Sequence, residues 1–450
     1  MADWIKNFGP KNLDRTRFER LADGLAVALV VSLPWSTSLT GIFVGLWLIA
    51  LIPTLNIAGL RRVVATPAGG LPVLFWLLAV IGMVWAFGVP MVERWDGLKS
   101  LFKLLVIPLL MFQFQRSSRA PWVMIGFLLS CGVLLILSWV LILVPTLHLP
   151  WKQNGFGVPT KDYIAQTGEF AVCVFLLAGI VLKTWQEQRR WVAIALLLCA
   201  LLFMSNLYFI TTSRTGLVVI PVLLLLLILR HGDRRRTVGL LVATAALGMA
   251  IWTFAPNIRN SVTDVWSEVR KFQPEGERTR AGERLEFWRK SIGFVADAPL
   301  LGHGTGSIRD QFRRAAVGQS GMAAMASANP HNQTFAVAIQ FGLLGTAVLF
   351  AMWLAHAALF RAEGMVAWVG LVVVTQNVVS SLFNSHLFDF TQGWGYVIGV
   401  GVAAGVVLQQ SGFRHAALDP ESFAPSAVDS PIKNYWVRTL HVMVHKHLRT

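Results

Sequence analysis

Long apolar blocks recur along the whole chain and are separated by short polar connections. Most of the blocks approach 20 residues, the length at which a helix crosses a hydrocarbon core of about 30 Å. This pattern predicts an all-α polytopic membrane protein with about twelve transmembrane helices. The predicted spans are 21–34, 36–54, 71–88, 98–113, 121–144, 165–183, 191–208, 215–230, 237–254, 333–359, 365–383 and 393–410.

One connection is long and has a different composition. Residues 255–332 are rich in Arg, Glu and Gly, and apolar residues recur at helical spacing over 261–272 and 282–298, which predicts two helices. A loop of this length with helices of its own is usually functional. The predicted organisation is helices 1–9 in 1–254, a large, partly helical loop at 255–332, helices 10–12 in 333–410, and a tail at 411–450.

The composition excludes a soluble fold. Hydrophobic residues make up 55% of the chain and charged residues only 14%, against about 25% charged residues in a soluble protein. In a soluble chain the net charge of +16 would suggest a nucleic-acid partner, but no nucleic-acid-binding motif is present. The basic residues lie mainly in short connections between apolar blocks, so we expect membrane lipids as partners and no nucleic acid.

The distribution of basic residues predicts the orientation in the membrane. Lys and Arg are enriched in short cytoplasmic connections, and here pairs such as Arg61 with Arg62 and Arg116 with Arg119 recur in alternate connections. The first apolar run lacks a small-residue cleavage site, so we expect a retained helix. Both termini are therefore predicted to be cytoplasmic, and residues 255–332 to lie on the opposite side.

Three segments with potential chemistry should meet at that opposite face. They are TTSRTG (211–216) before the eighth span, RLEFWRKSIGFVADAPLLGHGTG (284–306) in the long loop, and NPHNQTF (329–335) at the start of the tenth span. Together they contribute Arg214, Arg284 and His331 as candidate site residues.

His331 is expected in the first turn of the tenth predicted helix. Asn329 is a favourable N-cap, and Pro330 suits the first helical position. The partial positive charge of a helix N-terminus disfavours protonation, so the imidazole would be neutral, the form that a general base needs at neutral pH. The alternative is an interfacial histidine that only caps or packs.

The two arginines are candidates for anion binding. Arg214 is the only charged residue in its connection, on the side where basic residues are disfavoured, although a lone arginine there often just extends to lipid headgroups. With a helix N-terminus, Arg214 and Arg284 would form a phosphate or pyrophosphate site. The loop also offers other basic residues for the role of Arg284, namely Arg278, Arg280, Arg289 and Lys290.

The remaining polar residues have supporting or structural interpretations. Asp389, in the last outer connection, could orient His331 or an acceptor hydroxyl, and Asn332 is a further supporting candidate. No metal site is expected, because the histidines are scattered without paired carboxylates. Lys103 and Glu169 could pair between spans.

These segments resemble the O-antigen ligase and polymerase superfamily of bacterial envelope glycosyltransferases. The resemblance rests on SRTG (213–216), on PHN (330–332), and on a layout of about twelve spans with the long loop between the ninth and tenth. It also rests on a pattern within the loop formed by Arg284, Trp288, Pro299, Gly302 and Gly304.

The resemblance implies a GT-C-like glycosyltransferase architecture in the bacterial inner membrane, with an active site that faces the periplasm. A ligase of this superfamily transfers O-antigen glycan from undecaprenyl pyrophosphate to a sugar hydroxyl of lipid A–core. On this resemblance, Arg214 and Arg284 would hold the pyrophosphate and His331 would take the proton from the hydroxyl. The displacement would invert the anomeric carbon, and no metal or other cofactor is implied.

Other functions are compatible with part of the pattern. The O-antigen polymerase and the protein O-oligosaccharyltransferase share the motifs. The chain length and lack of an extended outer C-terminal domain argue against the protein O-oligosaccharyltransferase, and the ligase is preferred to the polymerase. A lipid-linked oligosaccharide flippase would predict charged residues in several spans and a repeat between halves, which the sequence does not show. A receptor or assembly scaffold would leave His331 without a chemical role.

Overall fold

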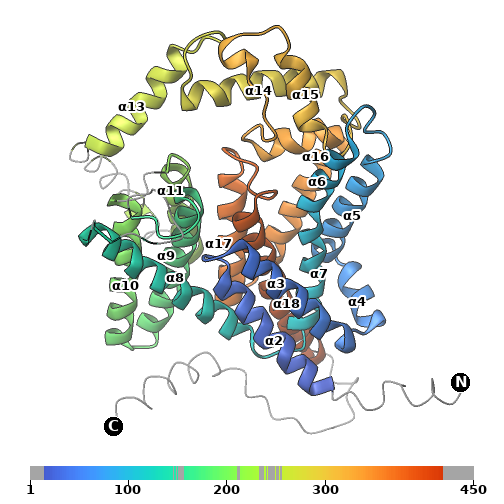
Figure 1. Cartoon of the computed structure of the whole chain (residues 1–450). Helices are drawn as coiled ribbons and strands as arrows, with labels where there is room; N and C mark the ends of the chain where they lie inside the picture. Colours follow the sequence, from blue (N-terminus) through green and yellow to red (C-terminus); the bar gives the residue numbers. More distant parts are fainter. Residues whose placement is uncertain are drawn as a thin grey trace, which may run out of the picture.

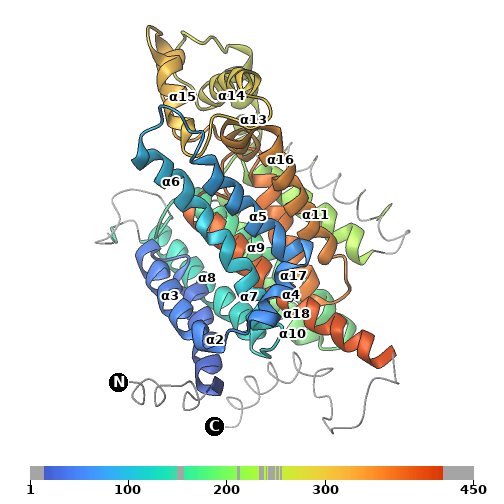
Figure 2. The ribbon, with the colours of Figure 1, turned by 90° about the vertical axis from the view of Figure 1, so that its right-hand side faces the viewer.

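The computed structural model describes residues 15–418, apart from positions 145, 148, 150–156, 210–212, 233–237, 240, 242–248, 250–252 and 254–255. Every regular element within these residues is a helix. Figures 1 and 2 show most of the helices packed side by side in a bundle, with α13, α14 and α15 across one end. The predicted span at 237–254 and the tail beyond 418 lie largely or wholly outside the described residues.

The described residues contain seven helical segments that are long and apolar enough to cross a membrane. The pair of α4 (Ile57–Val64) and α5 (Pro67–Gly82), bent by 88°, is an eighth candidate. The chain is therefore an all-α multi-pass membrane protein, whereas the predicted number of twelve spans stays a prediction. The seven segments are Thr37–Thr54, Met91–Phe114, Ala120–Leu143, Tyr163–Gln186, Arg190–Phe209, Gln333–Leu359 and Phe390–Ser411.

The predicted apolar blocks other than 237–254 each coincide with described helices, several of which are too short or too polar to count as spans. Two apolar helices have only 16 residues, α11 (Gly216–His231) and α17 (Met365–Ser380). The remaining helices of the bundle are α2 (Arg15–Ser32), α3 (Thr37–Leu51), α6 (Met91–Phe102), α7 (Val106–Phe114), α8 (Ala120–Leu143), α9 (Tyr163–Gln186), α10 (Arg190–Phe209), α16 (Gln333–Leu359) and α18 (Phe390–Leu418).

Helix α17 joins two hydrophobic cores. One core contains buried residues of α2, α3, α5, α7, α16 and α18, and the other contains buried residues of α8 to α11. Val373 of α17 belongs to the first core, and Trp368 and Val372 belong to the second. The indole nitrogen of Trp368 donates a hydrogen bond to the carbonyl of Phe175 in α9, 2.9 Å away. Burial of apolar surface from both sides thus packs α9 and α11 against α17.

Residues 256–332 form a helical cap over one end of the bundle. The cap contains α13 (Pro256–Arg270), α14 (Arg280–Asp297) and α15 (Ser307–Ala316), which confirms the helices predicted at 261–272 and 282–298. The hydroxyl of Thr279 accepts a hydrogen bond from the amide of Gly282 and caps α14. The cap packs on the first turns of α16 through a small core, made of Phe287, Phe294, Ile308, Phe312, Ala336 and Ile339.

A kink in α16 helps to seat the cap. Gly342 has φ 61° and ψ −154°, a backbone conformation that only glycine adopts without strain. The kink frees the amides of Leu343 and Leu344, which donate instead to the carbonyls of Pro299 and Leu300, over 2.8 and 3.2 Å. A side chain at Gly342 would also collide with the backbone of Leu300.

The glycine-rich segment 302–306 donates hydrogen bonds to backbone carbonyls of α16 just before this kink. The amides of His303 and Gly304 donate to the carbonyls of Ile339 and Gln340, over 2.8 and 2.9 Å. Gly302 has φ 64°, and a side chain there would meet the backbone of Gln340 at 2.5 Å. This segment is therefore a tight turn that docks on α16.

The connection between α17 and α18, residues 381–389, is held from two directions. The ammonium group of Lys103 donates to the carbonyls of Phe388 and Asp389, over 2.9 and 2.6 Å. The expected pair between Lys103 and Glu169 is not formed, because these carbonyls satisfy the buried ammonium group instead. On the other side, the amide of Gln333 donates to the carbonyl of Ser381.

Candidate active site

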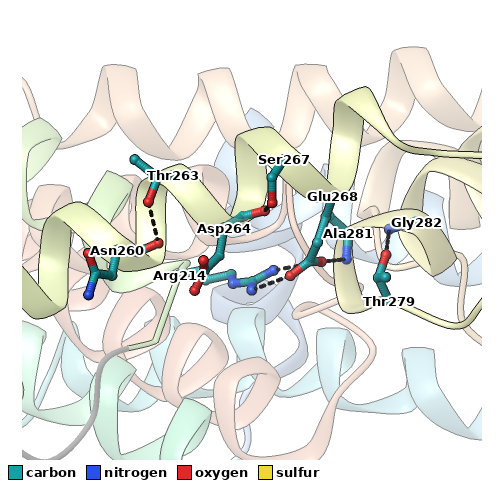
Figure 3. A network of polar contacts seen from close by, with 9 residues as sticks. All are labelled: Arg214, Asn260, Thr263, Asp264, Ser267, Glu268, Thr279, Ala281 and Gly282. Carbon is teal, nitrogen blue, oxygen red and sulfur yellow. Dashed lines mark hydrogen bonds and ion pairs between the residues drawn. The ribbon is translucent and has the colours of Figure 1, made fainter.

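Arg214 lies just before α11 and forms an ion pair with Glu268 of α13. Its two terminal nitrogens donate to the two carboxylate oxygens of Glu268, over 2.8 and 3.3 Å (Figure 3). The same carboxylate accepts a hydrogen bond of 2.7 Å from the amide of Ala281, in the first turn of α14. The hydrogen bonds from Arg214 lower the pKa of Glu268, so this carboxylate is ionised at neutral pH.

Arg284 lies one turn further along α14 and is half-buried. Among the described residues, none accepts a hydrogen bond from its guanidinium group. Burial lowers the pKa of Arg284, and the nearby charge of Arg214 lowers it further. A partly desolvated guanidinium without an acceptor is costly, because its five donors lose bonds to water without replacing them. Arg284 therefore offers its donors to an anion.

The other basic residues named as competitors are engaged elsewhere or exposed. Arg278 pairs with Glu283, and Arg289 pairs with Glu286 through two hydrogen bonds of 2.8 and 2.7 Å. Lys290 donates to the carbonyl of Ala323, and Arg280 is exposed. Because Arg284 alone among them lines the same cavity as Arg214, the geometry favours it as the partner of Arg214.

Arg214 and Arg284 line one cavity of about 550 Å³, a size typical of ligand pockets. The cavity lies between the start of α11 and the cap helices α13 and α14. Apart from the two arginines and Thr263, its lining is apolar. The apolar lining residues are Leu217, Val218, Val262, Val265, Trp266, Val269, Ala281, Leu285, Trp288 and Phe383.

A further apolar cavity lies among α2, α8, α9, α17 and α18. Glu169, Gln376, Thr391 and Gln392 are its main polar lining residues, and no arginine or lysine lines it. This cavity therefore has no cation for a phosphate group, and the cavity beneath α13 is the better candidate for an anionic ligand.

His331 lies before α16 and not in its first turn, so the expected helix start is wrong. The side chain of Asn332 accepts from the amide of Phe335 and caps the helix, which begins at Gln333. The side chain of Asn329 instead accepts from the amide of His331 and closes a turn. His331 has φ 53°, a left-handed conformation that is uncommon outside glycine and often marks a functional residue.

The imidazole of His331 is held by the connection between α17 and α18. Its Nδ1 lies 3.0 Å from the side-chain oxygen of Asn384, and the side-chain nitrogen of Asn384 donates to the carboxylate of Asp389 over 2.8 Å. Because a carboxylate accepts from Asn384, the oxygen of Asn384 faces His331 and can only accept a proton from Nδ1. Nε2 is then the unprotonated nitrogen, the one that a general base requires.

The surroundings of His331 also keep it neutral. Burial is the largest cause that lowers the pKa of His331, and the positive charge of Arg284 lowers it further. The ring stacks on Phe287 at a centroid distance of 5.9 Å and an interplanar angle of 21°. Phe287 lies three residues after Arg284 on α14, so the two residues share one face of this helix. The cap therefore brings His331 near enough to the cavity arginine for the charge of Arg284 to act on the imidazole.

The two supporting residues have different environments. Asp389 reaches His331 through Asn384 and not directly, and burial raises the pKa of Asp389 to about 6. Asn332 caps α16 and donates to the carbonyl of Leu382 over 3.1 Å. Asn332 thus ties the start of α16 to the connection that carries Asn384.

Sequence reasoning missed Asn384 and Glu268. Asn384 belongs to a polar stretch between two apolar blocks, NSH at 384–386, which could have drawn attention to it. His386 of the same stretch is buried, and burial lowers its pKa to about 4, with a further contribution from the charge of Arg284. No sequence signal distinguishes Glu268 from the other carboxylates of the loop. Within the described part of the chain, no three His, Cys, Asp or Glu residues are grouped as metal ligands.

Residues 199–350 match the family described as O-antigen ligase. This part of the chain is therefore similar to an O-antigen ligase domain. The match covers about a third of the chain and includes α11, the cap and the start of α16, and thus Arg214, Arg284 and His331. The chain matches no curated protein.

The O-antigen ligase family carries out ligase- or polymerase-type transfer of lipid-linked glycans. The match therefore implies an enzyme of the glycosyltransferase type, with lipid-linked glycans as its substrates. Asn384 and Asp389 lie outside the matched residues, so their place beside His331 comes from the tertiary structure alone.

Proposed function

We propose that this protein is an O-antigen ligase of the bacterial inner membrane. It transfers the glycan from undecaprenyl pyrophosphate to a sugar hydroxyl of lipid A–core, in the periplasm and without a metal ion. The observation that carries this proposal is the cavity beneath α13, where Arg214 and Arg284 lie at a wall that is otherwise apolar except for Thr263. A polyprenyl pyrophosphate has the matching chemistry, an anionic headgroup on a long hydrocarbon chain.

The two arginines bind the pyrophosphate of the donor. Guanidinium groups bind phosphate oxygens through pairs of parallel hydrogen bonds, and the first turn of α14 adds a backbone amide at Ala281. The isoprenoid chain extends along the apolar residues of α11 and α13. No described protein group accepts a hydrogen bond from Arg284, so its N–H groups are available to the phosphate oxygens of the glycan donor.

His331 acts as the general base. Nδ1 holds its proton against Asn384, and Nε2 takes the proton from the attacking hydroxyl of the acceptor. The low pKa of His331 keeps the imidazole neutral and able to accept this proton at neutral pH. Asn384 and Asp389 fix the orientation of the ring.

The reaction is a direct displacement at the anomeric carbon. The acceptor oxygen forms a bond to this carbon as its proton passes to His331, and the bond from the carbon to the pyrophosphate oxygen breaks. The leaving pyrophosphate takes the bonding electron pair, and Arg214 and Arg284 stabilise the negative charge that develops. Attack from the side opposite the leaving group inverts the configuration of the carbon.

The test uses the full-length protein in detergent with two substrates and no added nucleotide. The substrates are an undecaprenyl-pyrophosphate-linked glycan and lipid A–core. Formation of glycan-extended lipid A–core supports the ligase. Longer undecaprenyl-linked glycan without extended lipid A–core would show a polymerase, and transfer to neither acceptor would refute the proposal.

A further inference from the structure

Glu268 occupies an anion position beside the cavity, on the guanidinium group of Arg214, which lines it. Its carboxylate accepts two hydrogen bonds from Arg214 and a third from the amide of Ala281 (Figure 3). These donors, a guanidinium group and the N-terminal amide of an 18-residue helix, are the groups that bind phosphate oxygens in proteins. Arg284 lies one turn away on the same helix and has no acceptor among the described residues.

The pair is partly enclosed, with 25% of the Arg214 side chain and 19% of the Glu268 side chain exposed. Without Glu268, two arginine charges would face an apolar cavity with no counter-charge, which is unfavourable when water is partly excluded. A carboxylate carries one charge and two acceptor oxygens, whereas a pyrophosphate carries more of both and can also reach Arg284. The carboxylate of Glu268 therefore neutralises Arg214 when no donor is bound, and a bound pyrophosphate interacts more strongly with both arginines.

We propose that Glu268 stands in for a donor phosphate in the empty site and that the pyrophosphate of the donor displaces it. This inference rests on the proposed function, because it assigns the cavity to a polyprenyl pyrophosphate. It adds a residue that competes with the substrate for Arg214. The same competition acts on the polyprenyl pyrophosphate that is released after transfer, so Glu268 weakens the binding of both.

The test measures the binding of undecaprenyl pyrophosphate to the purified, full-length protein. Glu268→Gln keeps the shape of the side chain and removes its charge, so the ligand no longer displaces a carboxylate from Arg214. We expect the Kd to fall about tenfold, which corresponds to about 1.4 kcal/mol. If Glu268 instead positions Arg214 for the donor, the same substitution raises the Kd, and the inference is overturned.

Asp264→Asn is the matched control. Asp264 lies one turn before Glu268 on α13 and contributes to the electrostatic field at Arg214, but the dashed bonds of Figure 3 join Arg214 to Glu268 and not to Asp264. This variant removes the same unit of charge from the same helix. We expect its Kd to stay within about threefold of the wild-type value. An equal gain in both variants would mean that general charge, and not occupation of the site, controls binding.

A double variant tests whether the gain acts through Arg214. In the Arg214→Ala background, Glu268→Gln should no longer tighten binding, because the competition for this guanidinium has gone. A gain that persists in this background would overturn the inference. Glu268→Ala is a second route to the same measurement if the glutamine variant does not fold, and it should also lower the Kd.

Failure of the inference and failure of the proposed function give different results. If wild-type protein does not bind undecaprenyl pyrophosphate, or if Arg214→Ala binds it normally, the cavity is not the donor site and both ideas fail. If wild-type protein binds and Arg214→Ala binds more weakly, but Glu268→Gln does not tighten binding, the donor site stands and the role of Glu268 is refuted.

Discussion

Replacement of Asn384 by alanine tests how the general base is oriented. Three hydrogen bonds converge on the Asn384 side chain. Its oxygen lies 3.0 Å from Nδ1 of His331 and 2.7 Å from the side-chain nitrogen of Asn329, and its nitrogen lies 2.8 Å from Asp389. Asn384→Ala removes the only described side-chain acceptor of the imidazole and leaves the ring stacked on Phe287 alone.

The expected loss of rate follows from the free energy of that hydrogen bond. Leaving a half-buried donor without its partner costs about 1–3 kcal/mol. Since about 1.4 kcal/mol corresponds to a tenfold change in rate, kcat should fall by roughly 5- to 150-fold. This is less than the full contribution of a general base, because the imidazole remains present and only loses its orientation and its preferred tautomer.

The assay compares kcat with donor binding for the purified variant. Donor Kd should stay near the wild-type value, because Asn384 does not line the cavity beneath α13. Ser385→Ala is the control, since Ser385 donates to Asn329 over 2.8 Å and forms no hydrogen bond with the imidazole. A folded Asn384→Ala protein with kcat within threefold of wild type would show that Asn384 does not orient the base.

Five further outcomes are expected. His331→Ala should lower kcat by about 10²- to 10⁴-fold with donor binding retained. Wild-type activity should fall only below pH 6.5, because burial and the charge of Arg284 lower the pKa of His331 and keep its imidazole neutral above that pH. Loss of activity above pH 6.5 on acidification would contradict this. Arg284→Ala should weaken both donor binding and turnover. Arg284→Lys should restore them only in part, because lysine lacks the planar pair of hydrogen-bond donors. Normal kinetics of the alanine variant would show that Arg284 does not bind the donor. Excess EDTA should leave activity unchanged, and rescue of a lost activity by Mg²⁺ or Mn²⁺ would refute the metal-independent mechanism. Reporter fusions near residue 235 should be cytoplasmic and those near 280 periplasmic, and fusions that report the same side would contradict the orientation.

The helices of the bundle could be predicted because their signal is local. A run of apolar residues has to form a helix in lipid, since no water is available to its backbone groups. The same local logic predicted α13 and α14 from apolar residues at helical spacing. The number of spans was less predictable. Helices α11 and α17 have only 16 residues each, so their length and hydropathy do not establish that they cross a membrane.

The start of α16 shows where local rules failed. Asn329 and Asn332 are equally good caps by residue type, and Pro330 favoured the earlier one. The choice depends on residues distant in sequence, because Asn329 also bonds to Asn384 and Ser385 from the connection after α17. Those bonds hold Asn329 in a turn, and His331 is left outside the helix in a left-handed conformation.

The sequence by itself determined the membrane class of the protein and its long polar loop, and it indicated three candidate residues for transfer from a lipid pyrophosphate. Only the tertiary structure decided that Arg284, and not a neighbouring basic residue, shares a cavity with Arg214, and that Asn384 contacts His331. It also placed Glu268 on Arg214, 54 residues away in the chain. Apolar periodicity acts within one helix, whereas the partners of a polar side chain are chosen by how separate helices pack, which no single stretch of sequence records.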